Sequence, residues 1–464
     1  MRKNLLAAIV LLVLYIPSVW AAAGYPVRGR VIDRLSREPV AYAAVTITGQ
    51  PGKGAMTDSL GRFEILQVKP GIYSLTASFI GYRTVVTPEY QVSARTPFIE
   101  IEMEEEPEHL NEVVVRPSPF RRTIESPVSM QVIGMREIEK SPGSNRDVSR
   151  IVRSYPGVSF SPIGYRNDLI VRGGGPSENR FFMDGIEIPN INHFATQGAT
   201  GGPVSIVNSD LVREINFYTG SFPADRAGAL SSVLDFRLRD GDLERQTFKA
   251  TLGASEVSLS GSGHVGKKTT YLFSVRQSYL QFLFKLLGLP FLPNYIDGQL
   301  KVKTRFSERD ELTFLGLVGI DNMKLNLDEK GEENEYLLSY LPRIQQETFT
   351  VGAVYRHFAG RHVQSVALSH NYLNNRNTKY RNNDESTPDN LTLRFENRSY
   401  LGRWTLREGA ELNYSTYHNK TLQRTYQQEA ELLDYRTYLG IVGWGFFVGA
   451  DYASADKRLA GSGA

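Results

Sequence analysis

The stretch IVRGGGPSENRFFMDGIEI, Ile170 to Ile188, organises the rest of the chain. It contains two short strand-like runs, Leu169–Arg172 and Arg180–Asp184, separated by a glycine-rich bend over Gly173–Gly175. A tight Asp184-Gly185 turn follows the second run. The pattern predicts a compact hairpin that ends in another turn. A phosphate cradle is the alternative for three glycines beside an arginine, but neither the GxxxxGK spacing nor a strand-glycine-helix context is present.

An arginine-glycine pair that ends a strand, followed by Asp-Gly, resembles the plug domain of TonB-dependent outer-membrane receptors. The residues that carry this likeness are Arg172, Gly173, Gly174, Asp184 and Gly185. A second block, Gly220–Gly241, resembles the family's closing segment, in which a Gly-x-x-Pro-Ala run leads into the last plug strand. Pro223 and Ala224 supply that run here. The following residues, 225–228, read Asp-Arg-Ala-Gly where many members of the family have a tyrosine-glycine pair.

The composition excludes several kinds of protein. The chain has 464 residues, with 53 Lys and Arg against 50 Asp and Glu, so its net charge of +3 gives no electrostatic case for nucleic acid. It has no cysteine, which excludes disulfides, zinc-thiolate sites, thiol catalysis and a lipid-anchored N-terminal cysteine. The 24 Tyr, 23 Phe and 41 Gly fit a β-rich protein with many turns.

Residues 1–23 have the pattern of a cleaved secretory signal. Arg2 and Lys3 precede an apolar run over Leu5–Ile16, and small residues near Ala21 and Ala23 form the cleavage site. A retained anchor is the alternative, but the run is shorter than the ~20 residues that a spanning helix needs.

Residues 24–106 show short alternating runs with regular turn signals, which predict a small β-sandwich. In the run Gly71–Gly81, one face carries Tyr73, Leu75 and Ala77. The segments Val27–Gly49, Thr57–Phe63 and Gly71–Thr84 resemble the carboxypeptidase-regulatory-like domain. That resemblance implies a seven-stranded sandwich without catalytic residues.

An acidic run from Glu100 to Glu112 follows and is interpreted as the solvated edge of a linker. The linker, residues 107–119, contains a short β-prone segment that resembles the TonB box of receptors with this N-terminal extension. Its residues are Asn111, Glu112, Val113, Val114 and Val115. An extended segment of this kind can add as a strand to a partner's open sheet edge. The alternative is that these valines form the last strand of the sandwich.

Residues 120–241 are predicted to form an α+β plug. Ser144 is expected to cap a helix over Asn145–Arg153, and strands are expected at Val212–Tyr218 and Leu230–Leu238. The plug's polar residues are expected to pair with carboxylates of a surrounding barrel or to face water. Those residues are Arg166, Arg172, Arg180, Asp184, Arg213 and Arg226.

Residues 242–464 are predicted to form about ten antiparallel strands of a partial transmembrane β-barrel. The strand-like segments are Thr247–Ala254, Glu256–Val265, Thr269–Ser278, Gly298–Phe306, Glu311–Ile320, Glu347–Phe358, His362–Asn374, Leu391–Tyr400, Glu408–His418 and Tyr435–Tyr452. Long connections are predicted at Tyr279–Asp297, Asp321–Gln346, Asn375–Asn390 and Asn419–Asp434. Short turns that alternate with long loops are typical of outer-membrane barrels, and a soluble β-sandwich is the alternative.

No catalytic arrangement is visible, so the chain is not expected to be an enzyme, and no cofactor or metal is implied. The seven histidines are scattered without a HExxH or a His-Asp-Ser pattern. His357 and His362 flank one tight turn and are interpreted as surface residues rather than metal ligands. A peptidase regulatory fragment would require measured hydrolysis.

The resemblance implies an outer-membrane receptor that takes up a scarce solute into the periplasm, with the N-terminal domain and plug accessible from there. The implied partners are the TonB–ExbB–ExbD energy-coupling complex, outer-membrane lipid and a siderophore, glycan or peptide ligand, with a surface lipoprotein as an optional partner. The alternative function is a non-transporting surface binding or adhesion module that is soluble without detergent.

Two further expectations concern the chain end and the ligand. A plugged receptor has about 22 strands, so a chain with about ten of them that ends in LAGSGA is expected to be a C-terminally truncated piece. Aromatic and Asn-rich loop residues favour a polar, sugar- or peptide-like ligand. These residues are Tyr336, Tyr340, Asn374, Asn375 and Asn377.

Overall fold

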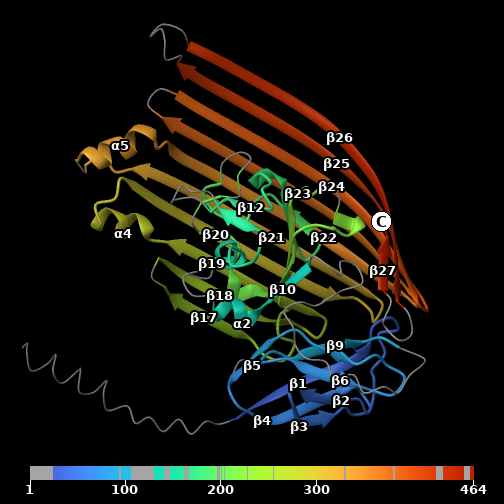
Figure 1. The fold of residues 1–464 in the computed structure, drawn as a ribbon. Coiled ribbons are helices and arrows are strands. Elements are labelled where there is room, and N and C mark those ends of the chain that lie inside the picture. Colours follow the sequence, from blue (N-terminus) through green and yellow to red (C-terminus); the bar gives the residue numbers. More distant parts are fainter. Residues whose placement is uncertain are drawn as a thin grey trace, which may run out of the picture.

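In a computed structural model of the chain, the structure describes residues 24–93, 96–105, 130–140, 147–160, 167–195, 199, 201–202, 204–226, 228–253, 255–328, 331–379, 382–424, 432–453 and 460–463. The predicted signal peptide and the segment Asn111–Val115 lie outside these residues. Three bodies follow one another along the described chain (Figure 1): a sandwich (residues 25–105), a plug (residues 130–238) and a long sheet that we call the wall (residues 247–463). None of the described helices has the length and hydropathy needed to cross a membrane.

The alternating pattern predicted a small β-sandwich, and the two main sheets of this domain contain the seven strands that the family resemblance implied. One sheet contains, in order, β4 (Arg62–Val68), β1 (Tyr25–Asp33) and β9 (Ile99–Met103). The other contains β3 (Gln50–Met56), β2 (Ala44–Ile47), β6 (Leu75–Ser78) and β7 (Val85–Val86). A small separate pair is formed by β5 (Gly71–Tyr73) and β8 (Tyr90–Val92). Alternate residues such as Val31, Val45, Phe63 and Leu75 fill the core between the sheets, because successive side chains of a strand point to opposite faces.

The acidic run does not begin in a linker. Glu100 and Glu102 belong to β9, which pairs in parallel with β1, and both carboxylates contact arginine side chains. The interpretation as a solvated linker edge is therefore wrong for these two residues. The arginines on neighbouring elements explain the difference, because they give the carboxylates partners that the local sequence does not reveal.

The plug is an α+β domain around a five-stranded sheet of order β10-β15-β16-β13-β14. The strands of this sheet are β10 (Met130–Gly134), β15 (Val212–Tyr218), β16 (Ser232–Leu238), β13 (Asn179–Met183) and β14 (Ile186–Ile188). A separate pair is formed by β11 (Val158–Phe160) and β12 (Leu169–Val171). The helices are α2 (Met135–Lys140), α3 (Val148–Val152) and the 3-10 turns η1 (Pro176–Glu178), η2 (Ser209–Leu211) and η3 (Ala224–Arg226).

Two local predictions about the plug are corrected. The runs at Leu169 and Arg180 do not pair with each other as a hairpin, because β12 pairs with β11 whereas β13 pairs with β14 and β16. The 3-10 turn η1 separates them and redirects the chain. The helix α3 is shorter than predicted and its N-cap is Asp147, whose carboxylate accepts a hydrogen bond from the Ser149 amide at 2.9 Å.

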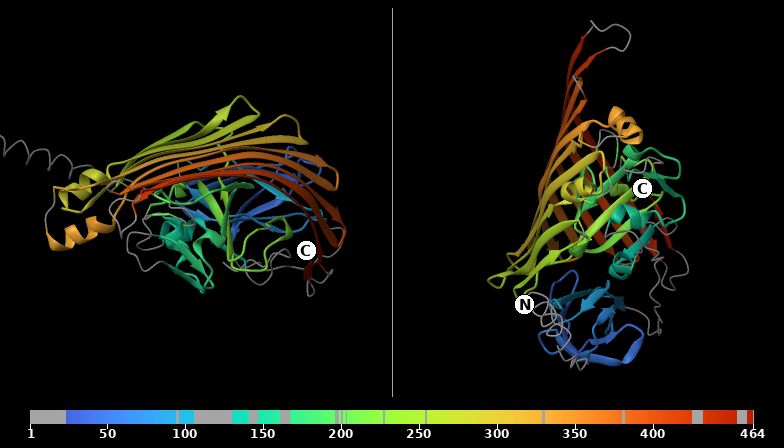
Figure 2. Two further views of the ribbon diagram at one scale, coloured as in Figure 1. Left: turned by 90° about the horizontal axis from the view of Figure 1, so that it is seen from above. Right: turned by 90° about the vertical axis from the view of Figure 1, so that its left-hand side faces the viewer.

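The wall is an antiparallel sheet in which the described strands β17 to β27 follow in sequence order. They are β17 (Thr247–Leu252), β18 (Glu256–Val265), β19 (Thr269–Ser278), β20 (Phe291–Arg305), β21 (Asp310–Leu325), β22 (Arg343–Ala359), β23 (His362–Lys379), β24 (Asn382–Leu401), β25 (Trp404–Arg424), β26 (Leu432–Ala453) and β27 (Ala460–Gly463). The sheet curves around the plug, which lies on its concave face (Figure 2).

Several wall strands are longer than predicted. The predicted long connection Asn375–Asn390 is wrong, because β23 and β24 continue as a paired hairpin as far as Lys379 and Asn382. The polar residues of this segment, such as Asn375 and Ser386, occupy strand positions without any apolar alternation. The alternating pattern used to predict the strands therefore stops before the strands do. The connection after Tyr279 contains helix α4 (Leu280–Leu286) and the start of β20, and the one after β21 contains helix α5 (Glu332–Tyr340).

The two ends of the wall differ. Helices α4 and α5 lie in the long connections at one end, whereas the sandwich lies at the other end (Figure 1). At the sandwich end, tight turns use glycines with positive φ, including Gly266, Gly360 and Gly402. We call this the short-turn end. The predicted alternation of short and long connections is therefore present.

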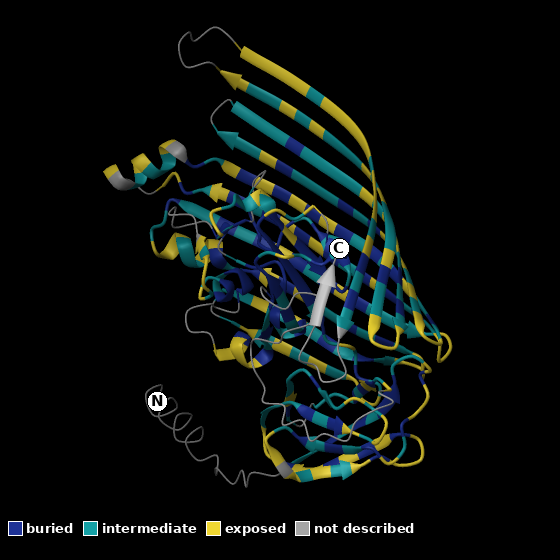
Figure 3. Ribbon diagram, turned by 45° about the vertical axis from the view of Figure 1, so that its right-hand side comes forward, coloured by how far each residue is buried: buried dark blue, intermediate teal, exposed yellow. Residues whose placement is uncertain are grey.

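Exposed and less exposed residues alternate along the wall strands (Figure 3), which shows that the two faces of the wall differ. The strand register places large apolar side chains on the convex face, where they are exposed. They include Leu259, Val275, Leu300, Phe314, Val318, Phe349, Val366, Leu393, Phe395, Leu412, Trp444 and Phe446. The concave face carries mainly polar residues, among them Ser274, Gln299 and Thr350. An apolar outer face and a polar inner face are the pattern of a sheet with lipid outside and a filled lumen inside.

Candidate functional site at the contact between plug and wall

The glycine bend of the plug is a close packing point rather than a ligand cradle. Arg172 and Gly173 both have positive φ, at 52° and 80°, which turns the chain sharply after β12. A Cβ on Gly174 would overlap Ser231 Oγ, so only glycine fits there. The Ser231 hydroxyl donates to the carboxylate of Glu178 beside the same bend. A carboxylate at this position argues against an anionic ligand such as phosphate.

The predicted Asp184-Gly185 turn is confirmed and it reaches the wall. It joins β13 to β14 as a two-residue hairpin loop in which both residues have positive φ, at 48° and 94°. The buried Asp184 carboxylate accepts a hydrogen bond from the Leu238 amide at 3.2 Å and lies 2.9 Å from the Lys301 ammonium of β20. The turn therefore also contributes a charged contact between plug and wall.

The predicted Pro-Ala run positions a second charged contact. The Pro223 carbonyl accepts a hydrogen bond from the Arg226 amide at 2.8 Å, which closes the turn that begins η3 at Ala224. This turn presents Asp225 to two wall arginines, Arg394 and Arg407, each at 3.4 Å. Burial alone raises the pKa of Asp225, but the neighbouring arginines outweigh burial and lower it.

The plug contributes the opposite charge to these contacts from the one expected. Arginines of the plug were expected to meet carboxylates of the barrel or water, yet Arg226 pairs with Asp235 at 3.2 Å and Arg180 with Glu187 at 3.0 Å, both inside the plug. At these two contacts the plug instead offers carboxylates, Asp184 and Asp225, to cations of the wall. The departure from the family pattern at residues 225–228 thus supplies an ion pair.

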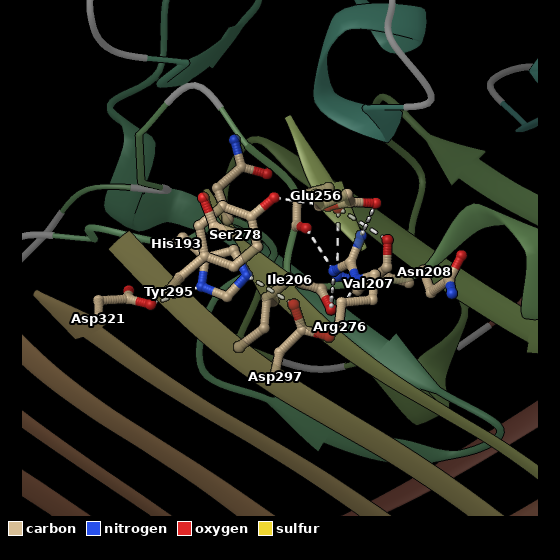
Figure 4. Close-up of polar contacts among 12 residues, drawn as sticks. His193, Ile206, Val207, Asn208, Glu256, Arg276, Ser278, Tyr295, Asp297 and Asp321 are labelled. Carbon is tan, nitrogen blue, oxygen red and sulfur yellow. Dashed lines mark hydrogen bonds and ion pairs between the residues drawn. The ribbon is translucent and has the colours of Figure 1, made fainter. Parts of the chain in front are cut away.

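A third contact centres on His193, which no sequence pattern had selected (Figure 4). Its imidazole is fully buried between two wall carboxylates, with Nδ1 2.6 Å from Asp321 and Nε2 3.0 Å from Asp297. The ring also stacks on Tyr295 at a centroid distance of 4.1 Å. Because both ring nitrogens face carboxylate oxygens, both carry a proton and the ring is an imidazolium.

Arg276 extends this cluster towards the next plug segment. It donates to Asp297 at 2.9 Å and to the carbonyls of Ser205 and Ile206 at 2.8 and 3.0 Å. Two cations, Arg276 and protonated His193, therefore balance two buried carboxylates. Such pairing is what makes buried charge tolerable.

Two glycines of the wall admit plug side chains between these charged contacts. A Cβ on Gly319 would overlap Ile206 Cδ1, and a Cβ on Gly352 would overlap Ile186 Cδ1. Plug and wall also share one apolar cluster, which includes Leu315, Leu317 and Val354 of the wall. The plug is thus seated by close packing as well as by charge.

Attachment of the plug is expected to be strongest below pH 6.5 and to weaken as the pH rises through about 9. Burial by itself lowers the pKa of an imidazole, but Asp321 and Asp297 outweigh burial and raise the pKa of His193 to about 9. A raised pKa stabilises below the ordinary value of 6.5, and the contribution is lost above the raised one. Thermal unfolding in detergent between about pH 6 and pH 10 measures this.

The matched variants are His193→Gln and His370→Gln, since His370 also faces a carboxylate, Asp389 at 2.9 Å, but is more than a third exposed. His193→Gln is expected to cost about 3–5 kcal/mol and to flatten the pH dependence, because it leaves buried carboxylates short of a partner. His370→Gln is expected to change neither. An unaltered pH profile in His193→Gln would contradict this assignment.

The other sequence candidates are not part of these contacts. His357 contacts Asp310 at 2.8 Å, whereas His362 contacts Ser399 at 2.8 Å. Among the described residues, no group of three or more acidic, His or Cys side chains is arranged to hold a metal ion. Of the predicted ligand-binding loop residues, Tyr336 is exposed on α5, whereas Asn374, Asn375 and Asn377 lie in β23 rather than in a loop.

Comparisons with known proteins agree with this architecture. The CarboxypepD_reg-like domain matches residues 27–115, and the TonB-dependent Receptor Plug Domain matches residues 122–231. The TonB-dependent transporter Oar of Myxococcus xanthus is 25% identical over 227 residues, which are 47% of this chain and 20% of that protein.

Three solved structures share the fold. They are the copper transporter OprC (12% identity, TM-score 0.52, covering 71% of this chain and 53% of that chain), the outer-membrane transporter YddB from Escherichia coli (10%, 0.50, 70% and 54%) and the siderophore receptor PirA from Acinetobacter baumannii (13%, 0.52, 71% and 55%). The chain spans about half the length of these structures and a fifth of Oar. The chain therefore contains a CarboxypepD_reg-like domain followed by a TonB-dependent receptor plug domain, it is homologous to the TonB-dependent transporter Oar, and its fold is similar to that of TonB-dependent receptors.

Proposed function

We propose that this protein is an energy-coupled outer-membrane receptor that takes up a scarce solute into the periplasm. The observation that carries the proposal is the seating of the plug against the polar concave face of the wall by three buried charged contacts, centred on Asp184, Asp225 and His193. The apolar convex face of the wall supports a position in lipid. Such a plug blocks a pore and has to move before solute passes.

The two ends of the wall support one orientation in the membrane. We place the short-turn end and the sandwich in the periplasm and the α4 and α5 connections outside the cell, because outer-membrane barrels have short periplasmic turns. The proposed partner on the periplasmic side is the TonB–ExbB–ExbD complex, which would pair with the segment Asn111–Val115 as an added strand.

The ligand proposed here is polar and uncharged, such as a glycan or a peptide. On the concave face towards the long connections, β22 to β25 carry neutral side chains, including Gln346, Asn375, Asn413 and Ser415. Asn375 and Gln346 are buried and have side-chain atoms without a hydrogen-bond partner. Amides of this kind suit a ligand that offers both donors and acceptors. Siderophores remain the competing class.

Deleting the gene in its native host and testing growth on single iron and carbon sources examines this proposal. The expected result is a loss of growth on a glycan or peptide source, with growth restored when the gene is returned. A protonophore is expected to cause the same loss. Growth loss restricted to an iron chelate would reject the neutral ligand and keep the transporter. Unimpaired growth together with a protein that is soluble without detergent would favour the adhesion module instead.

A further inference from the structure

One arginine of the wall forms hydrogen bonds with the sandwich. Arg305 lies at the short-turn end of β20, and its guanidinium donates two hydrogen bonds to the Glu100 carboxylate, at 3.0 and 2.7 Å. Among the described residues, Glu100 is the hydrogen-bond partner of the Arg305 side chain. Glu100, in contrast, also pairs with Arg30 and Arg37 of its own domain. The two hydrogen bonds of the Arg305 guanidinium therefore both go to the sandwich.

Two neighbouring hairpins of the wall receive arginines from one loop of the sandwich. The Arg37 guanidinium lies over the Phe358 ring of β22, 4.6 Å from its centroid, although Arg37 is only 2% exposed and has a positive φ of 62°. Arg34 lies 5.2 Å from the centroid of the Tyr400 ring of β24. A strained backbone at a buried arginine that reaches another domain indicates that the loop is shaped for this contact.

The same sandwich also holds the plug. The amide of Arg136, at the start of α2, donates to the Glu89 carboxylate at 2.8 Å, and its guanidinium donates to the Ile72 carbonyl at 2.9 Å. The sandwich thus contacts the plug and three wall strands at once. None of the apolar clusters spans the sandwich and either neighbour within the described residues. A domain contact that consists of ion pairs and arginine–aromatic contacts, without a shared apolar core, resembles a transient interface and can open and close reversibly.

These contacts enclose a cavity of about 590 Å³ between the three bodies. Its lining comes from β7 to β9 of the sandwich, from the plug sheet and from the inner face of the wall. Nine Lys or Arg and nine Asp or Glu side chains lie in this lining, so opposite charges balance. Such a cavity is a hydrated vestibule without preference for an anion or a cation.

We propose that the sandwich is a closure of the short-turn mouth: docked through Glu100 and the loop around Arg37 it covers the vestibule beneath the plug, and it has to undock before solute leaves. The direction of solute movement rests on the proposed function, whereas the closure itself does not. The CarboxypepD_reg-like domain thereby acquires a role as an exit gate that also steadies the plug.

A single cysteine in the vestibule tests this, since the chain has none of its own. Ser365→Cys is suitable because Ser365 is a small residue of β23 that lines the cavity. In the otherwise native protein in detergent, a bulky polyethylene-glycol maleimide is expected to label the introduced thiol slowly. Adding Arg305→Glu is expected to raise the rate roughly tenfold, because two charge-assisted hydrogen bonds become a repulsion. N-ethylmaleimide, which is small, is expected to label both proteins and shows that the thiol is intact.

Two matched variants complete the test. Arg309→Glu makes the same charge change in the same hairpin, where the exposed side chain faces solvent, and is expected to leave labelling slow. Arg305→Lys keeps the charge and is expected to stay near the parent rate. If the Arg305→Glu protein does not fold, Arg305→Ala is used in its place. Rapid labelling of the parent, or equal rates in the parent and in Arg305→Glu (or in Arg305→Ala where it replaces that variant), would overturn the closure. Because uptake is not measured, either result leaves the proposed transport to its own experiment.

Discussion

Joining Ile206 to Gly319 by a disulfide is expected to stop solute uptake while ligand binding at the cell surface persists. Ile206 belongs to the plug and Gly319 to β21, and the Cβ position of Gly319 lies 3.4 Å from Ile206 Cγ1. One further carbon–carbon bond puts the two Cβ atoms roughly 4–5 Å apart, close to the spacing of a disulfide. A plug tied to the wall cannot leave the lumen, so transport is expected to fall to the level of the deletion strain.

The measurement is uptake by cells that carry Ile206→Cys with Gly319→Cys, before and after a reductant. The native chain has no cysteine, so the introduced pair has no competing thiol within it. Ile206→Cys alone is the first control and is expected to transport, since it removes bulk. The second control is Gly319→Cys with Ile206→Ala, which leaves room for the new Cβ and has no second thiol to cross-link with. Recovery after reduction distinguishes a locked plug from a misfolded one. Full uptake with complete cross-linking would show that the plug does not need to separate from the wall here.

Local chemistry accounts for the parts of the fold that the sequence predicts well. Strand β15 has the predicted bounds, Val212–Tyr218, because its β-prone residues are followed by a Thr-Gly pair that favours a turn. The Asp184-Gly185 turn could be placed because few residues accept a positive φ. The sandwich could be recognised because alternate residues such as Leu75 and Ala77 are buried.

Pairing partners and strand ends could not be predicted in the same way. The run at Leu169 pairs with Phe160, upstream of it, and not with the run downstream, which only the folded chain reveals. Wall strands continue beyond their apolar part into segments rich in Asn and Ser, such as that around Asn375, where backbone pairing needs no apolar alternation. Sequence patterns therefore located the wall but shortened its strands.

The charged contacts were hidden for the same reason. His193 meets Asp297 and Asp321, which follow it by 104 and 128 positions. The sequence pattern places both aspartates at the edges of predicted loops, where a side chain is not expected to face a lumen. The local sequence predicts that Glu100 is solvated, because its partner Arg305 is 205 positions away. A useful signal for such residues is a charged side chain at an inward position of an extended wall strand.

Proline at Val114 is expected to abolish uptake and to leave ligand binding and protein abundance unchanged. The segment Asn111–Val115 lies outside the described residues, so this prediction rests on its sequence. Proline removes one main-chain donor and fixes φ, and both changes weaken the addition of this segment as a strand to a partner. Val114→Ala keeps the donor and is the matched control, with uptake expected near the native level.

The alternative assigns these valines to the sandwich, where β9 is an edge strand with one side open to a further strand among the described residues. In that case the same proline would destabilise residues 24–106, lower protein abundance and, if the sandwich closes the short-turn mouth, expose the vestibule thiol of Ser365→Cys to the bulky maleimide. Coupling predicts slow labelling and lost uptake, whereas the structural alternative predicts fast labelling and reduced abundance. Normal uptake in Val114→Pro would end the coupling assignment, because a segment that tolerates a lost donor at its centre does not pair as a strand through that residue.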